Sequence, residues 1–326
     1  MNKIVLSLTV IPQTRGIQFI VALLVFSLAS CGKSPDSVST LAHDSTSSTL
    51  DERLLRFNPY ASNPVFAGTG SNTWDRHIRE RGYILFEDGI FHLWYTGFAD
   101  DESDMHLGYA TSPDGINWTR YANNPIVNEG WVEDMMVIKR DSVYYMFAEG
   151  RDDIAHLLTS TDRVHWKEQG SLDVRYKDGR PLSPGPYGTP TAWYEGDTWY
   201  LLYERGDLGI WLATSTDLKT WTNVDDDPVI RNGPEPYDKY GVAVNQVVMR
   251  NGVYYAYYHA TALEDWSEWS SCVATSTDRL HWTKYSGNPI LKENKSSPIT
   301  VYDGRSIRLY TMHPQVALHT SQENQH

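Results

Sequence analysis

One short phrase recurs four times in this 326-residue chain and constrains the fold more than any other feature. Each copy has an Ala-Thr-Ser-like triplet, a variable residue and an Asp, followed four residues later by a Trp. The copies are residues 110–114 with Trp118, 158–162 with Trp166, 213–217 with Trp221, and 274–278 with Trp282. The Trp residues are 48, 55 and 61 positions apart, which indicates a repeated structural unit of about 55 residues.

Each repeat has the pattern of four antiparallel strands. An aromatic run precedes every phrase, at residues 91–95, 144–147, 199–203 and 254–258. Another apolar stretch comes before each aromatic run and ends in a turn-forming pair such as Asp88-Gly89 or Asn251-Gly252, which is typical of a hairpin. We name these strands A to D in chain order. Four-stranded antiparallel units without helical periodicity predict the blades of an all-β propeller.

The two ends of the chain indicate the number of blades. In three of the four repeats strand D is followed by an Asn-Pro or Asp-Pro tag, as at Asn124-Pro125, and one more such tag occurs early, at Asn63-Pro64. The C-terminal residues have runs resembling strands A, B and C but no strand D. We therefore expect residues near 57–66 to supply the outer strand of the last blade, which removes an exposed sheet edge. Residues 51–326 are predicted to form one five-bladed β-propeller.

The first 50 residues have a different character. Residues 19–26 are an apolar run preceded by Lys3 and Arg15, the pattern of a signal peptide over residues 1–30. Residues 28–32 (Leu-Ala-Ser-Cys-Gly) resemble a bacterial lipobox, which implies cleavage before Cys31 and lipidation of its thiol. Residues 31–50, rich in Ser and Thr, are expected to be a flexible tether. The prediction is an exported protein, lipid-anchored to the cell membrane or outer membrane; the alternative is an ordinary secretory signal with a chance cysteine.

Charge and cysteine content exclude several classes. The net charge is −13, and no basic block is present, which argues against nucleic acid as a partner. Two cysteines exclude a disulfide-stapled fold and a multi-cysteine zinc site. No cofactor or metal is indicated, although a structural Ca²⁺ in the central channel stays open as an alternative.

Propellers usually bind ligands at the channel mouth, where strand A of each blade begins. Alignment of the hairpin turns places Arg81, Asp134, Thr189 and Val244 at this position, flanked by Glu80, Glu133, Asn245 and Gln246. At the ends of strand B stand Thr96, Glu149, Glu204 and His259, with Arg151 and Arg205 close behind. Exposed aromatic residues are candidates for stacking on sugar rings: Trp74, Trp131, Tyr187, Tyr240 and Trp266.

These motifs resemble those of the five-bladed glycoside hydrolases of families 43, 32 and 130. The resemblance rests on the Trp-Tyr-Thr-Gly run at residues 94–97, the repeated phrases, and the Asn-Pro-Ile tags. Residues 131–137 look like the Glu-Asp-Pro-Arg segment of family 130 or the Arg-Asp-Pro segment of family 32, with Asp134 at the position of the Asp. The resemblance implies a glycoside hydrolase that acts on an oligo- or polysaccharide.

Two departures from the family pattern concern the chemistry. Families 43 and 32 open blade one with an Asp that serves as base or nucleophile, where this chain has Arg81. They open blade three with a Glu that serves as acid, where this chain has Gly188-Thr189-Pro190. Substitutes within reach are Asp75 or Glu80 in blade one and Glu204 in blade three.

Glycoside cleavage usually needs two carboxylates, one protonated and one ionised. The catalytic candidates are Asp134, Glu204 and Glu149, and because adjacent strand residues face opposite ways, only one of Glu133 and Asp134 should reach the substrate. Their structural alternatives are ion pairs of Asp134 with Arg151 or Arg81 and of Glu204 with Arg205. The substrate-binding candidates are Asp75, Glu80, Arg81, Trp131, Glu133, Arg151, Tyr187, Thr189, Arg205, Tyr240, Asn245, Gln246 and His259.

Other functional classes compete with hydrolysis. The missing carboxylates favour a non-catalytic carbohydrate-binding propeller. Phosphorolysis is disfavoured because Met136 replaces the Arg of the family 130 segment and because an exported protein meets little cytosolic phosphate. A sialidase is disfavoured because the Asp-box-like phrases come without a recognisable arginine triad.

Overall fold

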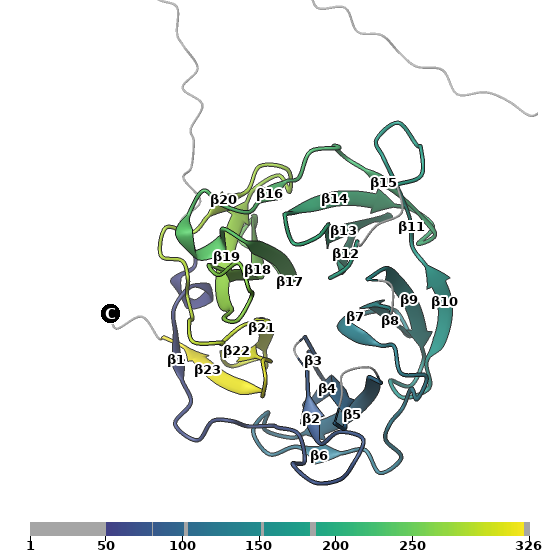
Figure 1. Cartoon of the computed structure of the whole chain (residues 1–326), viewed down its shortest axis with the longest axis vertical. Coiled ribbons are helices and arrows are strands. Elements are labelled where there is room, and N and C mark those ends of the chain that lie inside the picture. The colour runs from purple at the N-terminus through teal and green to yellow at the C-terminus, as the bar shows by residue number, and fades with distance from the viewer. Residues whose placement is uncertain (1–49, 80, 101–103, 151–152, 183–186, 323–326) are drawn as a thin grey trace, which may run out of the picture. The chain divides into compact units, whose positions relative to one another are not determined.

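Five β-sheets, antiparallel except for one parallel pair at the edge of the third, stand around a common centre in the computed structural model of the chain (Figure 1). The structure describes residues 50–79, 81–100, 104–150, 153–182 and 187–322. The expected signal peptide, Cys31 and all of the expected tether except Leu50 lie outside the described residues. The described helices are two three-residue turns, η1 (Glu52–Leu54) and η2 (Pro236–Asp238). Within those ranges, no helix is long and apolar enough to cross a membrane.

Each blade follows the predicted order of strands A to D. Blade one contains β3 (Tyr83–Glu87), β4 (Ile90–Phe98), β5 (His106–Ser112) and β6 (Thr119–Arg120), with β2 (His77–Ile78) also paired to β4. Blade two contains β7 (Glu133–Arg140), β8 (Val143–Glu149), β9 (Ala155–Ser160) and β10 (Lys167–Ser171). Blade three contains β12 (Thr191–Glu195), β13 (Thr198–Glu204), β14 (Gly209–Ser215) and β15 (Thr220–Asn223), extended by β11 (Asp173–Arg175) and β16 (Ile230–Arg231). Blade four contains β17 (Gly241–Arg250), β18 (Val253–Thr261), β19 (Ser270–Ser276) and β20 (Thr283–Lys284).

The last blade is closed by the N-terminal strand, as predicted. Its sheet has the order β1-β23-β22-β21, formed by β1 (Phe57–Pro59), β21 (Ile299–Tyr302), β22 (Ile307–Thr311) and β23 (Ala317–Ser321). Phe57 pairs with Ser321 in an antiparallel register, and Phe66 forms a further bridge with Val316. The all-β, five-bladed propeller is therefore confirmed, including its closure.

The two ends of the ring differ in what they contain. Strand A starts and strand B ends at one end, which we call the cavity end. The A–B hairpin turns and the turns of the repeated phrase lie at the other, which we call the turn end. At the turn end each Asp of the phrase closes its own turn: Asp114 Oδ1, for example, accepts hydrogen bonds from the backbone N–H groups of Ile116 (2.9 Å) and Asn117 (2.8 Å).

The repeated Trp residues pack between sheets. Trp221 is fully buried, and Trp118, Trp166 and Trp282 are partly buried against the hydrophobic clusters. Their regular spacing therefore reflects a packing position that recurs from blade to blade.

The chain enters the propeller at the turn end. Asp51 Oδ2 lies 2.7 Å from Arg250 Nε, and the Asp51 N–H donates to Tyr255 Oη at 2.8 Å. Both partners flank the β17–β18 hairpin turn. Leu54 and Leu55 are buried beside them in a cluster with residues of β18 and β22, which fixes this entry segment to blades four and five.

Candidate active site

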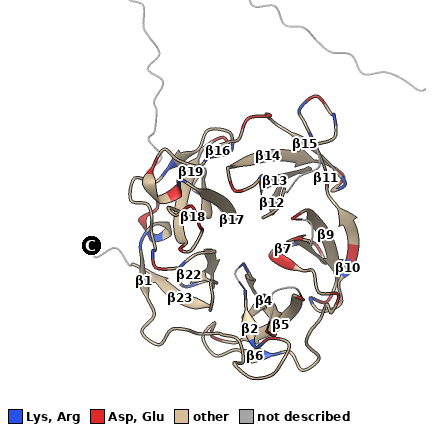
Figure 2. Cartoon of the chain, in the orientation of Figure 1, with Lys and Arg blue, Asp and Glu red and all other residues tan. Residues whose placement is uncertain are grey.

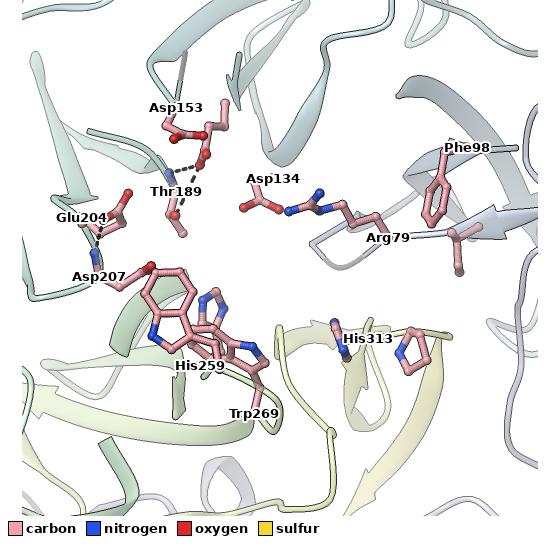
Figure 3. Close-up of a pocket in the computed structure, with 15 residues that line it drawn as sticks. Arg79, Phe98, Asp134, Asp153, Thr189, Glu204, Asp207, His259, Trp269 and His313 are labelled. Carbon is pink, nitrogen blue, oxygen red and sulfur yellow. Dashed lines mark hydrogen bonds between the residues drawn. The ribbon is translucent and has the colours of Figure 1, made fainter. Parts of the chain in front are cut away.

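A cavity of about 550 Å³ opens at the cavity end of the ring, and we call it the channel cavity (Figure 3). Carboxylates gather on the walls supplied by blades two and three, and Figure 2 shows the acidic start of β7 directed toward the centre of the ring. Aromatic and imidazole side chains come from blades one, four and five. The lining residues are Ile78, Arg79, Phe98, Asp134, Glu149, Asp153, Thr189, Glu204, Gly206, Asp207, His259, Trp266, Trp269, His313 and Pro314.

Asp134 is held at the cavity wall by a kink at the start of β7. Its φ is +50°, and the register of β7 against β8 shifts between Glu133 and Met136. The aligned residues Arg81 (φ +59°) and Thr189 (φ +50°) share this left-handed backbone, a geometry that costs a non-glycine residue of order 1–3 kcal/mol and is concentrated at functional sites. Asp134 Oδ2 lies 3.8 Å from Nη1 of buried Arg81.

The adjacent Glu133 is directed elsewhere. Its Oε2 lies 3.3 Å from Arg79 Nε, and Glu133 does not line the channel cavity. The structure thus places one of the two neighbouring carboxylates, Asp134, at the cavity, at the kink where the register of β7 shifts.

Glu149 ends β8 as a buried carboxylate. It is 8% exposed, and its Oε2 accepts a hydrogen bond from the backbone N–H of Thr189 at 2.8 Å. Burial raises the pKa of Glu149 well above its usual range, and the negative charge of Asp134 raises it further. A carboxyl in this environment is readily protonated, which is the property required of a general acid.

Gly188 gives a physical reason for the glutamate missing from blade three. A Cβ atom at Gly188 would lie 2.6 Å from Cδ of Glu149, so the Glu149 carboxylate fills the space that a side chain at position 188 would need. Blade three therefore has no glutamate at position 188, and the Glu149 carboxylate of blade two occupies the space beside it.

Glu204 ends β13 and is more tightly held than Glu149. Its Oε1 accepts from the N–H of Gly188 at 3.1 Å and its Oε2 from the N–H of Asp207 at 2.6 Å. Burial raises its pKa, while these backbone hydrogen bonds and the charge of Arg81 lower it in part. Both oxygens are thus fixed, and Glu204 in turn fixes the loop that carries Asp207.

The opposite wall is aromatic. His259 ends β18, and its ring lies 4.8 Å from that of Trp269, nearly perpendicular to it. Trp266 follows at 5.9 Å from Trp269 and is 46% exposed. Phe98 and His313 complete this wall in Figure 3. A sugar ring can use both walls. Its hydroxyl groups can donate to the carboxylates, and its C–H faces can pack on the aromatic rings.

Several sequence-predicted residues do not line the channel cavity. Asp75 is buried with Arg120 (Oδ2 to Nε 2.7 Å) and Tyr95 (Oδ2 to Oη 3.0 Å), so it does not replace the missing carboxylate of blade one. Gln246 instead joins blades four and five: its Oε1 accepts from Thr300 N–H at 2.7 Å, and its Nε2 donates to the Thr300 carbonyl at 2.9 Å. These two expectations are corrected by pairings that are distant in sequence.

Four of the five aromatic candidates, together with Arg205, contact other parts of the protein instead of the channel cavity. Trp131 packs on His156, the Tyr187 hydroxyl donates to the Leu172 carbonyl, and Arg205 lies over the ring of Trp211. Tyr240 accepts a hydrogen bond from Lys239, and Trp74 stacks on Tyr95. None of these five residues lines the channel cavity.

The remaining candidates divide three ways. Thr189 and His259 line the channel cavity. Arg81 and Asn245 are 1% exposed and are not among the lining residues; neither side-chain amide atom of Asn245 has a hydrogen-bond partner among the described residues. Glu80 and Arg151 lie outside the described residues.

Sequence reasoning missed Arg79, Phe98, Asp153, Asp207, Trp269 and His313. Two of these had a usable signal, because Asp153 and Asp207 follow the strand-ending Glu149 and Glu204 by four and three residues. In the described part of the chain, no group of three or more His, Cys, Asp or Glu residues is arranged to hold a metal ion.

The five-bladed ring with carboxylates at its channel mouth has the architecture of the propeller glycoside hydrolases that the sequence resembles. The chain matches no protein-family model. It is 26% identical over 227 residues to 1,2-beta-oligomannan phosphorylase of Thermoanaerobacter sp. (strain X514), covering 64% of this chain and 72% of that protein.

Solved structures share the fold at low sequence identity. A putative glycosidase of Bacteroides thetaiotaomicron VPI-5482 superimposes with a TM-score of 0.68 at 16% identity, covering 82% of this chain and 97% of the other. A structure from a study of family 130, described as mannoside phosphorylases that include glycoside hydrolases targeting β-1,2 mannosidic linkages in Candida mannan, gives a TM-score of 0.66 at 14% identity. That match covers 83% of this chain and 94% of the other.

Proposed function

We propose that this protein is a glycoside hydrolase that cleaves β-1,2-linked mannosides, with Glu149 as general acid and Asp134 as general base. The substrate class is supported by the sequence similarity to an enzyme named for 1,2-β-oligomannan. The two roles are argued from the environments of the carboxylates.

Glu149 has the environment of an acid. It is buried, its pKa is raised, and it occupies the space next to Gly188, where related families present their catalytic glutamate. Asp134 is 3.8 Å from the Arg81 guanidinium, and in Figure 3 the Arg79 guanidinium points toward it. Two guanidinium groups therefore stand beside Asp134, a position suited to a carboxylate that takes a proton from water.

The reaction follows from this pair. Glu149 gives its proton to the glycosidic oxygen, and the bond between that oxygen and the anomeric carbon breaks. A water molecule forms the new bond to the anomeric carbon while Asp134 takes the proton of the water. Thr189 N–H holds the Glu149 carboxyl in place, and Glu204 offers fixed acceptors to sugar hydroxyl groups.

The observation on which this proposal depends most is the charge of the cavity wall. Asp134, Glu149, Asp153, Glu204 and Asp207 all line it, whereas Arg79 is the one lysine or arginine among the described lining residues. Phosphorolysis would require a phosphate dianion beside these carboxylates, and like charges in a partly desolvated site repel strongly. Water as the nucleophile avoids this repulsion.

Product analysis tests the proposal. Purified protein is incubated with β-1,2-mannobiose and β-1,2-oligomannan, with and without inorganic phosphate, and the products are separated as mannose or mannose 1-phosphate. We expect mannose in both conditions and loss of activity in Asp134→Asn, with Asp114→Asn as the control from the turn end. Phosphate-dependent release of mannose 1-phosphate would replace hydrolysis with phosphorolysis.

A non-catalytic binding protein is the second candidate. Two observations favour it. Arg81 in blade one and Gly188 in blade three stand where the related families have carboxylates, and backbone hydrogen bonds hold both oxygens of Glu204. Calorimetric binding of oligomannan by wild-type protein, without product after prolonged incubation, would establish this function instead.

We further propose that the enzyme acts outside the cytoplasm from a lipid anchor. The lipobox-like residues 28–32 and the preceding apolar run support this location. Metabolic labelling with an alkyne fatty acid should mark the wild-type protein and leave Cys31→Ser unmarked. Labelling of both proteins, or of neither, would contradict the anchor.

A further inference from the structure

A second hollow lies at the cavity end beside the channel cavity. We call it the outer hollow; its volume is about 290 Å³, and its walls include Pro236, Tyr237, Leu263, Glu268, Trp269 and Lys292. Trp269 lines both hollows, so they adjoin at this residue. The walls belong to the loop between β18 and β19 and to the connections that enter and leave blade four. The outer hollow therefore continues the channel cavity outward over that blade.

Apolar side chains are exposed along this route. Six large hydrophobic residues are exposed in the described part of the chain: Leu208, Met249, Leu263, Trp266, Leu280 and Tyr302. Three of them, Leu208, Leu263 and Trp266, lie in the β13–β14 and β18–β19 loops at the cavity end. Exposed apolar groups concentrated beside a ligand cavity mark a binding surface more often than scattered ones do.

The loop that carries Trp266 is held by its own hydrogen bonds. Thr261 Oγ1 donates to the Glu268 carbonyl at 2.8 Å and accepts from Leu263 N–H at 3.1 Å. Trp266 N–H donates to the Leu263 carbonyl at 3.2 Å, and Trp269 N–H to Asn294 Oδ1 at 2.8 Å. A loop fixed at both ends presents its indoles in one arrangement, which reduces the entropic cost of binding a ligand against them.

The chemistry of the outer hollow suits a carbohydrate. Proline, leucine and indole surfaces match the C–H faces of a pyranose ring, and the Glu268 carboxylate, Lys292 ammonium and Tyr237 hydroxyl offer partners for its hydroxyl groups. We propose that the outer hollow, reached across Trp266 and Trp269, is a subsite for sugar units of an oligosaccharide beyond those bound in the channel cavity. This inference rests on the proposed glycosidase function and makes chains, rather than disaccharides, the preferred substrate.

Chain-length dependence tests the subsite. Leu263→Ala and Lys292→Ala change residues of the outer hollow that do not line the channel cavity, and Tyr302→Ala, exposed at the turn end, is the matched control. On β-1,2-mannotetraose we expect each outer variant to raise KM about fivefold with kcat unchanged. On β-1,2-mannobiose both constants should match wild type. Equal changes on the two substrates, or none on either, would overturn the subsite.

Binding separates failure of the subsite from failure of the proposed reaction. Calorimetry with mannotetraose on Asp134→Asn, with and without Lys292→Ala, needs no turnover. A loss of affinity on adding Lys292→Ala supports the subsite even if wild-type protein hydrolyses nothing. Identical affinities for the tetrasaccharide would refute it even in an active enzyme.

Discussion

The two ends of the propeller use carboxylates in opposite ways. At the turn end, the Asp residues of the repeated phrase stand in partly exposed turns and accept several hydrogen bonds each. Asp278 Oδ1 accepts from the N–H groups of Leu280 (2.9 Å) and His281 (2.8 Å) and from Ser276 Oγ (3.0 Å), and its pKa is lowered. Asp114, Asp162 and Asp217 repeat this pattern.

At the cavity end, the strand-ending Glu149 and Glu204 are buried and have fewer donors. Glu149 accepts from one residue, Thr189, and Glu204 accepts one backbone hydrogen bond on each oxygen. The pKa of each is raised because burial outweighs these bonds. The ionised form is thus favoured in the folded protein for the Asp residues of the repeated phrase and disfavoured for Glu149 and Glu204.

The largest expected contrast between the ends is in turnover. Glu149→Gln should lower kcat on β-1,2-mannobiose about 10²- to 10⁴-fold, because it removes the proton donor. On 4-nitrophenyl β-mannoside the loss should be much smaller, since nitrophenolate leaves without protonation. Asp278→Asn should leave both rates unchanged. Equal losses on the two substrates would exclude Glu149 as the acid.

A glycine from each end gives the second contrast. Gly188→Ala places a methyl group against the Glu149 carboxylate, and displacement of a catalytic group by about 1 Å costs about 100-fold in rate. Gly196, in the β12–β13 turn, has φ +57° and open space around it, so Gly196→Ala should cost about 1 kcal/mol of stability while turnover is retained. Steady-state kinetics and urea unfolding separate the two outcomes.

Removal of a turn-end carboxylate should affect stability alone. Asp278→Ala should lower the free energy of unfolding at pH 7 by about 1 kcal/mol, because backbone donors lose their acceptor in a half-exposed turn where solvent screens the charge. The folded pKa is lowered, so the ionic part of this stability is present above the ordinary value of 3.8 and is lost as pH falls through that value toward the folded pKa. Urea unfolding at pH 7 and pH 3 should give a smaller difference at pH 3, and a constant difference would contradict this reasoning.

The smallest expected effect has the opposite sign. Glu149 has a raised pKa in the folded protein, so its ionisation costs stability above its ordinary value of 4.5, increasingly as pH rises toward the folded pKa. Glu149→Gln keeps an oxygen for Thr189 N–H and should therefore melt at a higher temperature than wild type at pH 8, with the difference shrinking toward pH 4. Glu204→Gln should not show this gain, because both Glu204 oxygens accept backbone hydrogen bonds and the amide replaces one acceptor. A higher melting temperature of wild type than of Glu149→Gln at pH 8 would contradict the raised pKa of Glu149.

The sequence predicted the ring because its signals are local and repeated. The Trp phrase and the proline tags each occur in four of the five units, and with the hairpin turns they predicted the blade number, the closure by residues near 57–66, and the alignment of Asp134, Glu149 and Glu204 within their repeats. The cavity was less predictable, since its remaining wall depends on loops with no repeat, such as the one carrying Trp266 and Trp269.

Long-range pairing explains why Asp75 and Gln246 do not line the channel cavity. Asp75 was a plausible catalytic carboxylate until Arg120, 45 residues away, was found to hold it. Gln246 was expected at the channel, but the register shift beside Val244 directs it to Thr300, 54 residues away. No local pattern distinguishes a buried structural polar group from one that faces a substrate.

The contact of Asp51 with the β17–β18 hairpin has a practical consequence for large substrates. Asp51 lies at the end of the ring opposite the channel cavity, so a support coupled at residue 51 itself is joined on the side away from the mouth. Coupling at this residue leaves the mouth uncovered. A polysaccharide too large to diffuse beneath the protein then still has access to the carboxylates.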